Sequence, residues 1–317
     1  DLKLMALFSD PMVLQQMSKI PLGGLDKAGS GQDLPIIPVP AEVKETGPGH
    51  FTITSKTRIG FEMPLERSAL YLGEYCREIY RLNLPILPST GKKSDANLIS
   101  LEFDSTMIPG QYTLRISGKE IRIQGSEDGV FYGIQSLIQL LPATIPAKAG
   151  LLDVPFAGFA DKPRFEYRGM LLDVSRHFFP VGFLKKCIDY AAYHKMNTFH
   201  LHLTDDQGWR IEIKQYPLLN QIGSWRNGTM IGLYPGTGND SIRHGGYYTQ
   251  DELKELVAYA RDRFITLVPE IEMPGHSLAA LASYPYLGCT GGPYRVQESW
   301  GYSGDVYCVG KESTYEF

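Results

Sequence analysis

The stretch that decides the fold is residues 168–210, which read RGMLLDVSRHFFPVGFLKKCIDYAAYHKMNTFHLHLTDDQGWR. The apolar run 169–174 is typical of a short strand, and residues 198–204 are typical of a second one. Between them, Pro180 predicts a helix start, apolar residues follow at helical spacing, and Asn197 is expected to break the helix. This order predicts two parallel strands joined by a crossover helix.

Charged and polar residues come directly after both strands. Arg176 and His177 follow the first strand, and Asp205 and Asp206 follow the second. In α/β barrels the active site is built at the carboxyl ends of parallel strands. An ordinary strand–helix–strand unit with solvated loop residues is the alternative. Arg, His and two Asp at equivalent strand ends favour a functional site.

The same alternation continues toward the C-terminus. A long loop at 223–248 is followed by Thr249 and Glu252 at capping-box spacing, which predicts the start of another helix. Residues 265–273 are predicted to form a third strand, and His276 follows it. We expect His276 to share a rim with Arg176 and Asp205. The predicted fold class is therefore α/β, with three strand–helix units.

A different pattern precedes residue 151. It predicts a small α+β domain at 35–150, after an N-terminal extension at 1–34 and before the α/β domain at 151–317. A linker, PATIPAKAG, ends the first domain. The predicted elements of the α+β domain are strands at 51–61, 99–103, 112–116 and 120–124, and helices at 67–82 and 129–141.

Composition limits the classes of partner. The 317 residues are 43% hydrophobic and 21% charged, with a net charge of -4. A mildly acidic chain without a basic stripe argues against nucleic acid as a partner. No apolar run approaches the length of a membrane-spanning helix. The chain starts at Asp1, which is compatible with a processed or trimmed terminus.

The four cysteines fall into two pairs. Cys76 and Cys187 lie within apolar helical patterns, which favours buried thiols. Cys289 and Cys308 flank a loop rich in Gly, Tyr and Ser, where we predict a loop-closing disulfide, with free thiols as the alternative. A disulfide implies an oxidising compartment, which we expect to be the periplasm or the cell exterior.

One group of histidines allows a metal as an alternative. His200 and His202 share one face of the predicted strand, and such pairs ligate zinc in several barrel enzymes. His276 is a candidate third ligand, but no further His follows it and no cysteine has zinc spacing. We favour polar packing inside a barrel for the pair, and expect no metal or cofactor. Glu270 and Glu272 share a face, and we predict structural ion pairing for them.

The chain resembles glycoside hydrolase family 20, the β-N-acetylhexosaminidases, over roughly residues 35–317. The α/β part carries five matching phrases in the family's order, and "YTLRISGKEIRIQGSEDGVFYGIQSLIQLL" at 112–141 resembles the domain that usually precedes it. The five phrases are "RGMLLDVSRHF" at 168–178, "KMNTFHLHLTDDQGWRIEI" at 195–213, "YPLLNQIGSWR" at 216–226, "YTQDELKELVAYA" at 248–260 and "VPEIEMPGH" at 268–276.

The resemblance implies a (β/α)8 barrel, of which residues 151–317 would hold the first three units. It also implies a retaining hydrolase that removes terminal β-linked N-acetylglucosamine or N-acetylgalactosamine, using the substrate's own acetamido oxygen as nucleophile. Carried over by position, the family's roles imply that Arg176 binds sugar hydroxyls. They also imply that Asp205 with His276 forms a hydrogen-bonded support for the catalytic Glu, which protonates the leaving oxygen. Asp206 and Trp225 are further candidates for substrate contact, with packing as the alternative for Trp225. A homodimer is a further expectation.

One part of the family pattern has no counterpart in this sequence. The resemblance implies an Asp-Glu pair, in an H-x-G-G-D-E phrase, at the end of the next strand. No Asp-Glu dipeptide follows residue 273, and the sequence ends at KESTYEF. We expect the pair beyond residue 317. The alternatives are an inactive relative that binds amino sugars without cleaving them, and a metal-dependent hydrolase that uses His200, His202 and His276.

Overall fold

The computed structural model describes residues 36–89, 97–142 and 150–317. The chain divides into two compact units, Asp1–Pro163 and Arg164–Phe317, and each is described by itself. The expected N-terminal extension and most of the expected linker lie outside the described residues. Within those ranges, no helix combines the length and apolar character that crossing a membrane requires.

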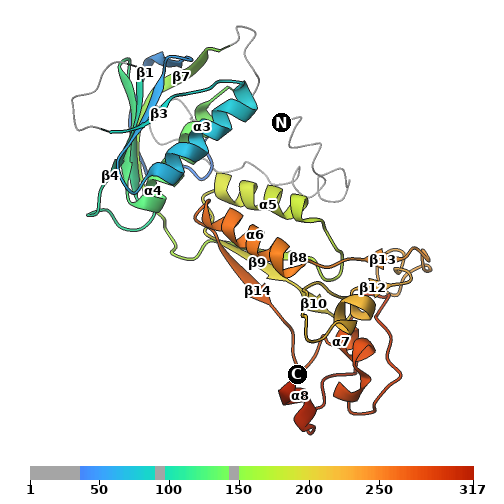
Figure 1. Cartoon of the computed structure of the whole chain (residues 1–317). Coiled ribbons are helices and arrows are strands. Elements are labelled where there is room, and N and C mark those ends of the chain that lie inside the picture. The colour runs from blue at the N-terminus through green and yellow to red at the C-terminus, as the bar shows by residue number, and fades with distance from the viewer. Residues whose placement is uncertain (1–35, 90–96, 143–149) are drawn as a thin grey trace. The chain divides into compact units, whose positions relative to one another are not determined.

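The first unit is a seven-stranded mixed sheet with two helices on one face (Figure 1). Its strand order is β1-β7-β5-β6-β4-β2-β3. The helices are α3 (Glu66–Tyr80) and α4 (Glu127–Leu140). The strands are β1 (Glu42–Ile53), β2 (Arg58–Phe61), β3 (Ile86–Pro88), β4 (Leu98–Phe103), β5 (Tyr112–Ile116), β6 (Glu120–Gly125) and β7 (Leu152–Asp161).

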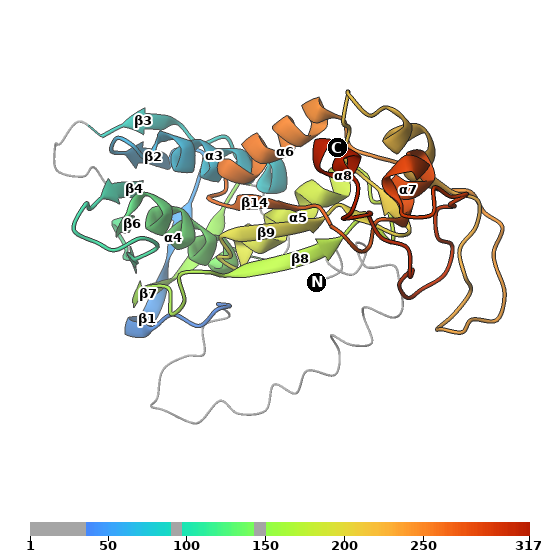
Figure 2. The same cartoon turned by 90° about the horizontal axis from the view of Figure 1, so that it is seen from below.

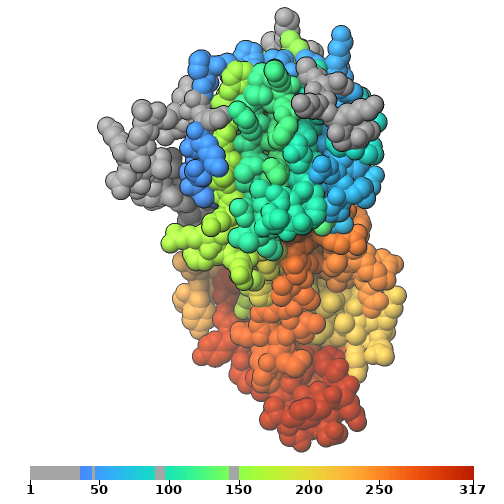
Figure 3. Space-filling model, turned by 90° about the vertical axis from the view of Figure 1, so that its left-hand side faces the viewer, coloured from blue at the N-terminus to red at the C-terminus, as the bar shows by residue number. Residues whose placement is uncertain are grey.

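An apolar core between sheet and helices holds this unit together. Ile121 and Ile123 of β6 and Phe131 and Ile134 of α4 are fully buried. Ser126 caps α4 by accepting the backbone N–H of Gly129 at 3.2 Å. Figure 3 views the unit from the side opposite the helices, where β1 (blue) and β7 (yellow-green) lie at one end of the sheet.

The first unit corrects two predictions. The single strand predicted at 51–61 is two strands, because a turn closed by Thr57 N–H to Thr54 O at 2.9 Å separates β1 from β2. The boundary between units lies at Pro163/Arg164 instead of 150/151. It lies there because β7 pairs antiparallel with both β1 and β5 and so completes the first sheet.

The second unit contains the predicted parallel strands. They are β8 (Gly169–Asp173), β9 (Thr198–His202) and β14 (Thr266–Glu270), in the order β14-β9-β8. Two helices, α5 (Val181–Tyr193) and α6 (Gln250–Arg261), lie side by side over one face of this sheet (Figures 1 and 2). The strand–helix alternation read from the sequence is confirmed.

Several boundaries in this unit differ from the prediction. Helix α5 ends at Tyr193, before Asn197, because Lys195 adopts a left-handed backbone conformation with φ of 59°. Strand β14 ends at Glu270, short of residue 273. Thr249 and Glu252 form the predicted capping box of α6.

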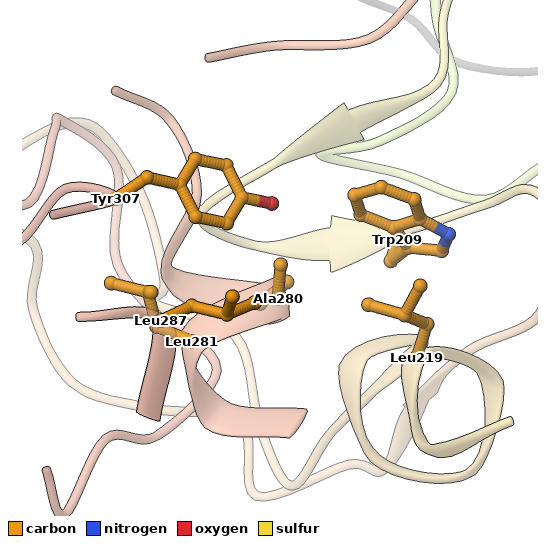
Figure 4. Close-up of a cluster of buried hydrophobic side chains, with 7 residues drawn as sticks. Trp209, Leu219, Ala280, Leu281, Leu287 and Tyr307 are labelled. Carbon is orange, nitrogen blue, oxygen red and sulfur yellow. The ribbon is translucent and has the colours of Figure 1, made fainter. Parts of the chain in front are cut away.

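Short elements follow the strands and pack on a separate apolar cluster. Trp209, Leu219, Leu281, Leu287 and Tyr307 are buried against one another (Figure 4). They join the hairpin after β9 to segments near the C-terminus. These elements are β10 (Thr204–Asp205), β11 (Gly208–Trp209), the π-helical turn η1 (Leu219–Gly223), β12 (Trp225–Arg226), β13 (His244–Gly245), α7 (Leu278–Ser283), η2 (Pro285–Leu287) and α8 (Glu312–Glu316).

Candidate active site

A network of charged side chains lies at the carboxyl ends of the three parallel strands. The last residues of the strands, Asp173, His202 and Glu270, are aligned in register across the sheet. Parallel pairing therefore brings residues that are distant in sequence to one edge. Loops carrying Arg176 and Asp205 begin at this edge, so the predicted convergence at the strand ends is confirmed for these residues.

Asp205 is the centre of the network, and its side chain has 0% exposure. Its Oδ2 accepts from Arg176 Nη2 at 2.6 Å and lies 2.8 Å from His202 Nε2. Its Oδ1 accepts the Asp206 backbone N–H at 2.6 Å and lies 3.0 Å from His276 Nδ1. Four donors around one buried carboxylate compensate for its lost hydration.

The protonation of His202 follows from its two carboxylate partners. Nε2 faces Asp205, and Nδ1 lies 3.1 Å from Glu270 Oε2. Burial by itself lowers the pKa of His202, but hydrogen bonds to Asp205 and Glu270 outweigh it and raise the pKa above its ordinary value. An imidazolium at this position donates to both carboxylates, and its single positive charge offsets part of their negative charge.

The pKa of Asp205 moves in the opposite direction. Burial acts to raise it, but the hydrogen bonds from His202 and from the Asp206 backbone, with the charges of Arg176 and His276, hold the pKa below its ordinary value. Asp205 is therefore ionised at neutral pH. An ionised Asp205 orients the three cationic or donor side chains around it.

Arg176 is held from two sides and remains accessible. Its Nη1 donates to Asp173 Oδ2 at 3.0 Å, and its Nη2 donates to Asp205. Asp173 Oδ1 also accepts the backbone N–H groups of Ser175 and Arg176, which fixes the turn after β8. With 29% of its side chain exposed, Arg176 can present its remaining N–H donors to a ligand.

His276 is the most exposed member of the network, at 39%. It lies in the turn after β14, where its own φ is 50°. If Asp205 accepts from Nδ1–H, the tautomer of a neutral His276 is fixed and Nε2 is the acceptor nitrogen. The predicted pairing of Asp205 with His276 is thus present in the structure.

The structure gives Asp206 a role different from the predicted one. Asp206 has 0% exposure, and its two oxygens accept the backbone N–H groups of Leu278 at 3.0 Å and Ser303 at 2.9 Å. Because both oxygens are engaged in the interior, the side chain anchors two C-terminal segments and does not face a ligand. Although Asp205 and Asp206 are adjacent in sequence, their carboxylates have separate partners: side chains and the Asp206 N–H for Asp205, backbone N–H groups of later segments for Asp206.

Trp225 also lies apart from the charged network. Its ring lies 4.3 Å from the Arg243 guanidinium carbon, and its Nε1 donates to Asn220 O at 3.1 Å. It lines a separate cavity of about 490 Å³ with Glu212, Lys214 and Tyr247. None of the residues that line this cavity belongs to the charged network. The predicted substrate contact by Trp225 therefore has no support from its position.

The three histidines of the metal alternative do not converge. His200 Nε2 lies 2.7 Å from Glu270 Oε2, whereas His276 faces Asp205 on the other side of His202. Among the residues that the structure describes, two groups could place ligand atoms together, His202 with Glu270 and Glu272, and Asp205 with Asp206 and His276. Most of these atoms are already hydrogen-bonded within the protein. Glu270 Oε2 and Glu272 Oε1 lie 3.1 and 3.8 Å from His202 Nδ1, so the ion pairing predicted for these two residues is present when His202 is protonated.

Sequence reasoning missed His202 and Asp173 as members of the site. Both had a signal in the sequence, because each lies near the carboxyl end of a predicted parallel strand, and in the structure each is the last residue of its strand. The i, i+2 spacing of His200 and His202 drew attention to metal binding instead. Strand register across the sheet, which places both beside Arg176 and Asp205, is a tertiary property.

A disulfide-closed loop lies against the same strand end. Cys289 and Cys308 form the predicted disulfide, while Cys76 and Cys187 are free thiols. Within the loop, the carbonyl oxygens of Ser299 and Gly301 accept from Gln207 Nε2 at 3.1 and 3.3 Å. The disulfide therefore closes a loop that is fixed to the segment carrying Asp205.

The chain is similar to known proteins in both units. Residues 165–317 match the catalytic domain of glycosyl hydrolase family 20, and residues 33–155 match domain 2 of that family. A β-hexosaminidase of Porphyromonas gingivalis is 41% identical over 289 residues, which are 89% of this chain and 36% of the relative. One from Vibrio furnissii is 39% identical over 254 residues, 80% of this chain and 39% of the relative.

Solved structures agree with the sequence comparison. A family 20 exo β-N-acetylglucosaminidase from Vibrio harveyi, in complex with N-acetylglucosamine, has a TM-score of 0.76 and 34% identity, over 89% of this chain and 43% of that one. A Streptomyces plicatus β-hexosaminidase mutant has a TM-score of 0.75 and 36% identity, over 89% and 55%. The chain thus spans about a third to a half of the length of these relatives. With both units matched and the strand-end network in place, the chain belongs to glycosyl hydrolase family 20.

Proposed function

We propose that the protein acts as a β-N-acetylhexosaminidase, which removes terminal β-linked N-acetylglucosamine or N-acetylgalactosamine from glycans. The observation that carries the proposal is Arg176, held by Asp173 and Asp205 with part of its guanidinium exposed at the strand ends. A planar fork of donors suits a pair of sugar hydroxyls. Two similar structures, from Vibrio harveyi and Streptomyces plicatus, were solved with N-acetylglucosamine bound.

The same proposal includes the complete barrel. We propose that β8, β9 and β14 are the first three strands of a (β/α)8 barrel, preceded by the α+β unit. Their parallel order and the site at their carboxyl ends support this architecture. Leu171 of the flanking strand β8 is 54% exposed, as expected of a strand that packs against further barrel elements.

For the mechanism, we propose retention of configuration with the substrate's acetamido oxygen as nucleophile. A Glu acid and its Asp partner, from chain beyond residue 317, would protonate the leaving oxygen and orient the acetamide. Arg176 would bind the sugar ring, and its orientation depends on ionised Asp205. His276, linked to the same carboxylate, would present Nε2 toward the reacting end of the site.

The test is release of nitrophenol from a β-N-acetylglucosaminide, together with calorimetric binding of N-acetylglucosamine. We expect Arg176→Ala to weaken sugar binding at least a hundredfold, because a charge-assisted fork is removed. Arg115→Ala, at an exposed position on β5, is the matched control and should bind normally. Unchanged binding by Arg176→Ala would refute the assignment of this residue.

A second candidate function is recognition of amino sugars without cleavage. The observation that favours it is that Arg176, held by Asp173 and Asp205, can bind a sugar without any group that cleaves the glycosidic bond. Binding of N-acetylglucosamine without nitrophenol release, by protein that includes any chain following residue 317, would support this candidate. Turnover by that protein would exclude it.

We also propose that the protein works in the periplasm or outside the cell, as a homodimer. The Cys289–Cys308 disulfide supports the compartment, because disulfides persist in oxidising surroundings. Free thiols at these positions in protein isolated under thiol-blocking conditions would argue against it. Sedimentation at micromolar concentration tests the dimer.

A further inference from the structure

Arg210 is a buried cation whose partners are all neutral. Its side chain has 0% exposure, and within the described parts of the chain no carboxylate lies at ion-pair distance from it. Burial lowers the pKa of Arg210 to about 9, which leaves it charged at neutral pH. A buried guanidinium without a counter-ion is costly unless its donors are satisfied, so its hydrogen bonds matter.

The guanidinium donates only to backbone carbonyl groups, and these come from three separate loops. Nε lies 3.1 Å from Val174 O, and Nη2 donates to Ser175 O at 2.6 Å. Nη1 donates to Ser224 O at 2.7 Å and to Gly246 O at 3.1 Å. A longer contact of 3.5 Å joins Nη2 to Gln207 O.

Two of these loops carry the sugar-site residues. Ser175 directly precedes Arg176, and Gln207 follows Asp205 and Asp206. The turn that holds Arg176 is thus fixed on both sides: Asp173 accepts its N–H groups, and Arg210 donates to its carbonyls. Ser175 Oγ adds a third link by donating to Gly208 O at 2.6 Å.

Gly208 gives independent evidence that the guanidinium fits closely. A Cβ at this position would lie 2.2 Å from Arg210 Nη2 and 2.3 Å from Cζ. Gly208 does not have a positive φ, so its backbone conformation does not require glycine. The close approach of Arg210 does, and the guanidinium cannot move aside without losing its carbonyl partners.

We propose that Arg210 is a positioning residue for the sugar site, which sets Arg176 relative to Asp205 by binding the backbone of the loops that carry them. This inference rests on the proposed function, because the site that Arg210 organises is a sugar site only if that function is correct. Lys could not replace it, since one ammonium group cannot donate in one plane to carbonyls from several loops.

The test compares Arg210→Lys with Arg263→Lys in the full chain, at a temperature where both variants are folded by circular dichroism. Arg263 bonds to Asp189 and Tyr259 O and lies before β14, at the opposite end of the strands from the site. We expect Arg210→Lys to weaken N-acetylglucosamine binding at least tenfold. Arg263→Lys should bind as the unmodified protein does. Equal binding by all three proteins, or equal loss in both variants, would overturn the proposal.

Gly208→Ala is the second variant, because it displaces the guanidinium without removing it. We expect it to weaken sugar binding as Arg210→Lys does, and the double variant to be no worse than either single one. Additive losses would show that the two residues act separately and would overturn the proposal.

A ligand-independent readout separates this proposal from the proposed function. The proton titration of the His202 ring, followed by NMR, reports the positions of Arg176 and Asp205, because His202 Nε2 lies close to both side chains. We expect this titration to shift in Arg210→Lys and Gly208→Ala, and to stay unchanged in Arg263→Lys. Shifts without any sugar binding by the unmodified protein would leave the positioning role standing and refute the proposed function. Unshifted titrations would refute the positioning role.

Discussion

The two units of the chain fill their interiors in contrasting ways. In the first, most of the buried residues between sheet and helices are apolar, and Ile121, Ile123 and Ile134 have no exposed surface. In the second, the most buried positions at the strand ends are charged, with Asp205 and Arg210 at 1% and 0% exposure. Apolar burial stabilises without regard to direction, whereas a buried charge requires partners at fixed positions. The apolar interior of the first unit therefore stabilises the fold, and the buried charges of the second unit fix the positions of the side chains at the strand ends.

Both sheets are open at their edges, but they differ in size. The first has seven strands, and its edge strands are β1 and β3. In the second, β8 and β14 each pair only with β9 among the described residues, and β8 exposes Leu171. Unpaired strand edges are sites where further strands add. The second unit therefore has room for more strands, in agreement with the proposed barrel.

The largest effect that would test this contrast is expected from Asp205→Ala. It leaves Arg176, His202 and His276 without their shared carboxylate. We expect loss of N-acetylglucosamine binding and a decrease of about 3–5 kcal/mol in the free energy of unfolding of the second unit. Hydrogen exchange of β9 and β5 amides measures the two units separately. Asp153→Ala, an exposed position in the first unit, is the control, and similar losses in both variants would contradict the contrast.

The reverse case is Phe159→Ala in β7, a residue with 1% exposure. Removing this ring leaves a cavity in the first core, and we expect about 3–5 kcal/mol lower stability of that unit in denaturant unfolding. Sugar binding, measured by calorimetry below the transition, should stay at the unmodified level. Weaker binding by folded protein would show that the two interiors are not independent.

A smaller effect is expected from acid. His244 Nε2 accepts the backbone N–H of Phe178 at 3.0 Å, and its ring stacks on His177 with centroids 4.3 Å apart. Burial first, and then the charges of Arg226, His177 and Arg210, lower the pKa of His244 to about 4, while Asp240 acts against them. A folded pKa below the ordinary value of about 6.5 means that the neutral ring is favoured by folding.

The contribution of His244 is therefore present above pH 6.5 and is lost as pH falls from 6.5 toward 4. We expect this contribution to the free energy of unfolding to be about 1–2 kcal/mol, because solvent screens the partly exposed ring. His202 acts with the opposite sign, because its raised pKa favours the protonated form and its contribution is lost at higher pH. His244→Gln, which keeps an acceptor, should flatten the acid loss of stability in the second unit. His50→Gln, at an exposed position, should leave the pH dependence of stability unchanged. A flattened pH dependence in this control would contradict the assignment to His244.

The smallest effect is expected at the helix caps, where the units should behave alike. Thr249 caps α6 and Ser126 caps α4, each accepting a backbone N–H at 3.2 Å. We expect Thr249→Ala and Ser126→Ala each to cost about 1 kcal/mol in its own unit, since a capping bond is local. Denaturant unfolding followed by hydrogen exchange measures both. A loss that spreads to the other unit would show coupling between them.

Much of the site could be predicted because it follows strand ends. Arg176, Asp205 and His276 each come shortly after an apolar run, and parallel strands bring such positions to one edge. Asp206 shows where this reasoning stops. It is adjacent to Asp205 in sequence, yet its oxygens accept from Leu278 and Ser303, whose approach no local pattern indicates.

The sequence by itself determined the alternation of strands and helices, the capping box at Thr249 and the membership of Arg176 and Asp205 in one site. These features depend on hydrophobic periodicity and on interactions between residues that are close in sequence, so a local stretch of sequence is enough to predict them. Only the tertiary structure decided that β7 completes the first sheet, that His202 joins Asp205 to Glu270, and that Arg210 binds three loops. Those results depend on strand register and on contacts with backbone carbonyls that are distant in sequence. The residues next to each position in the sequence do not indicate either of them.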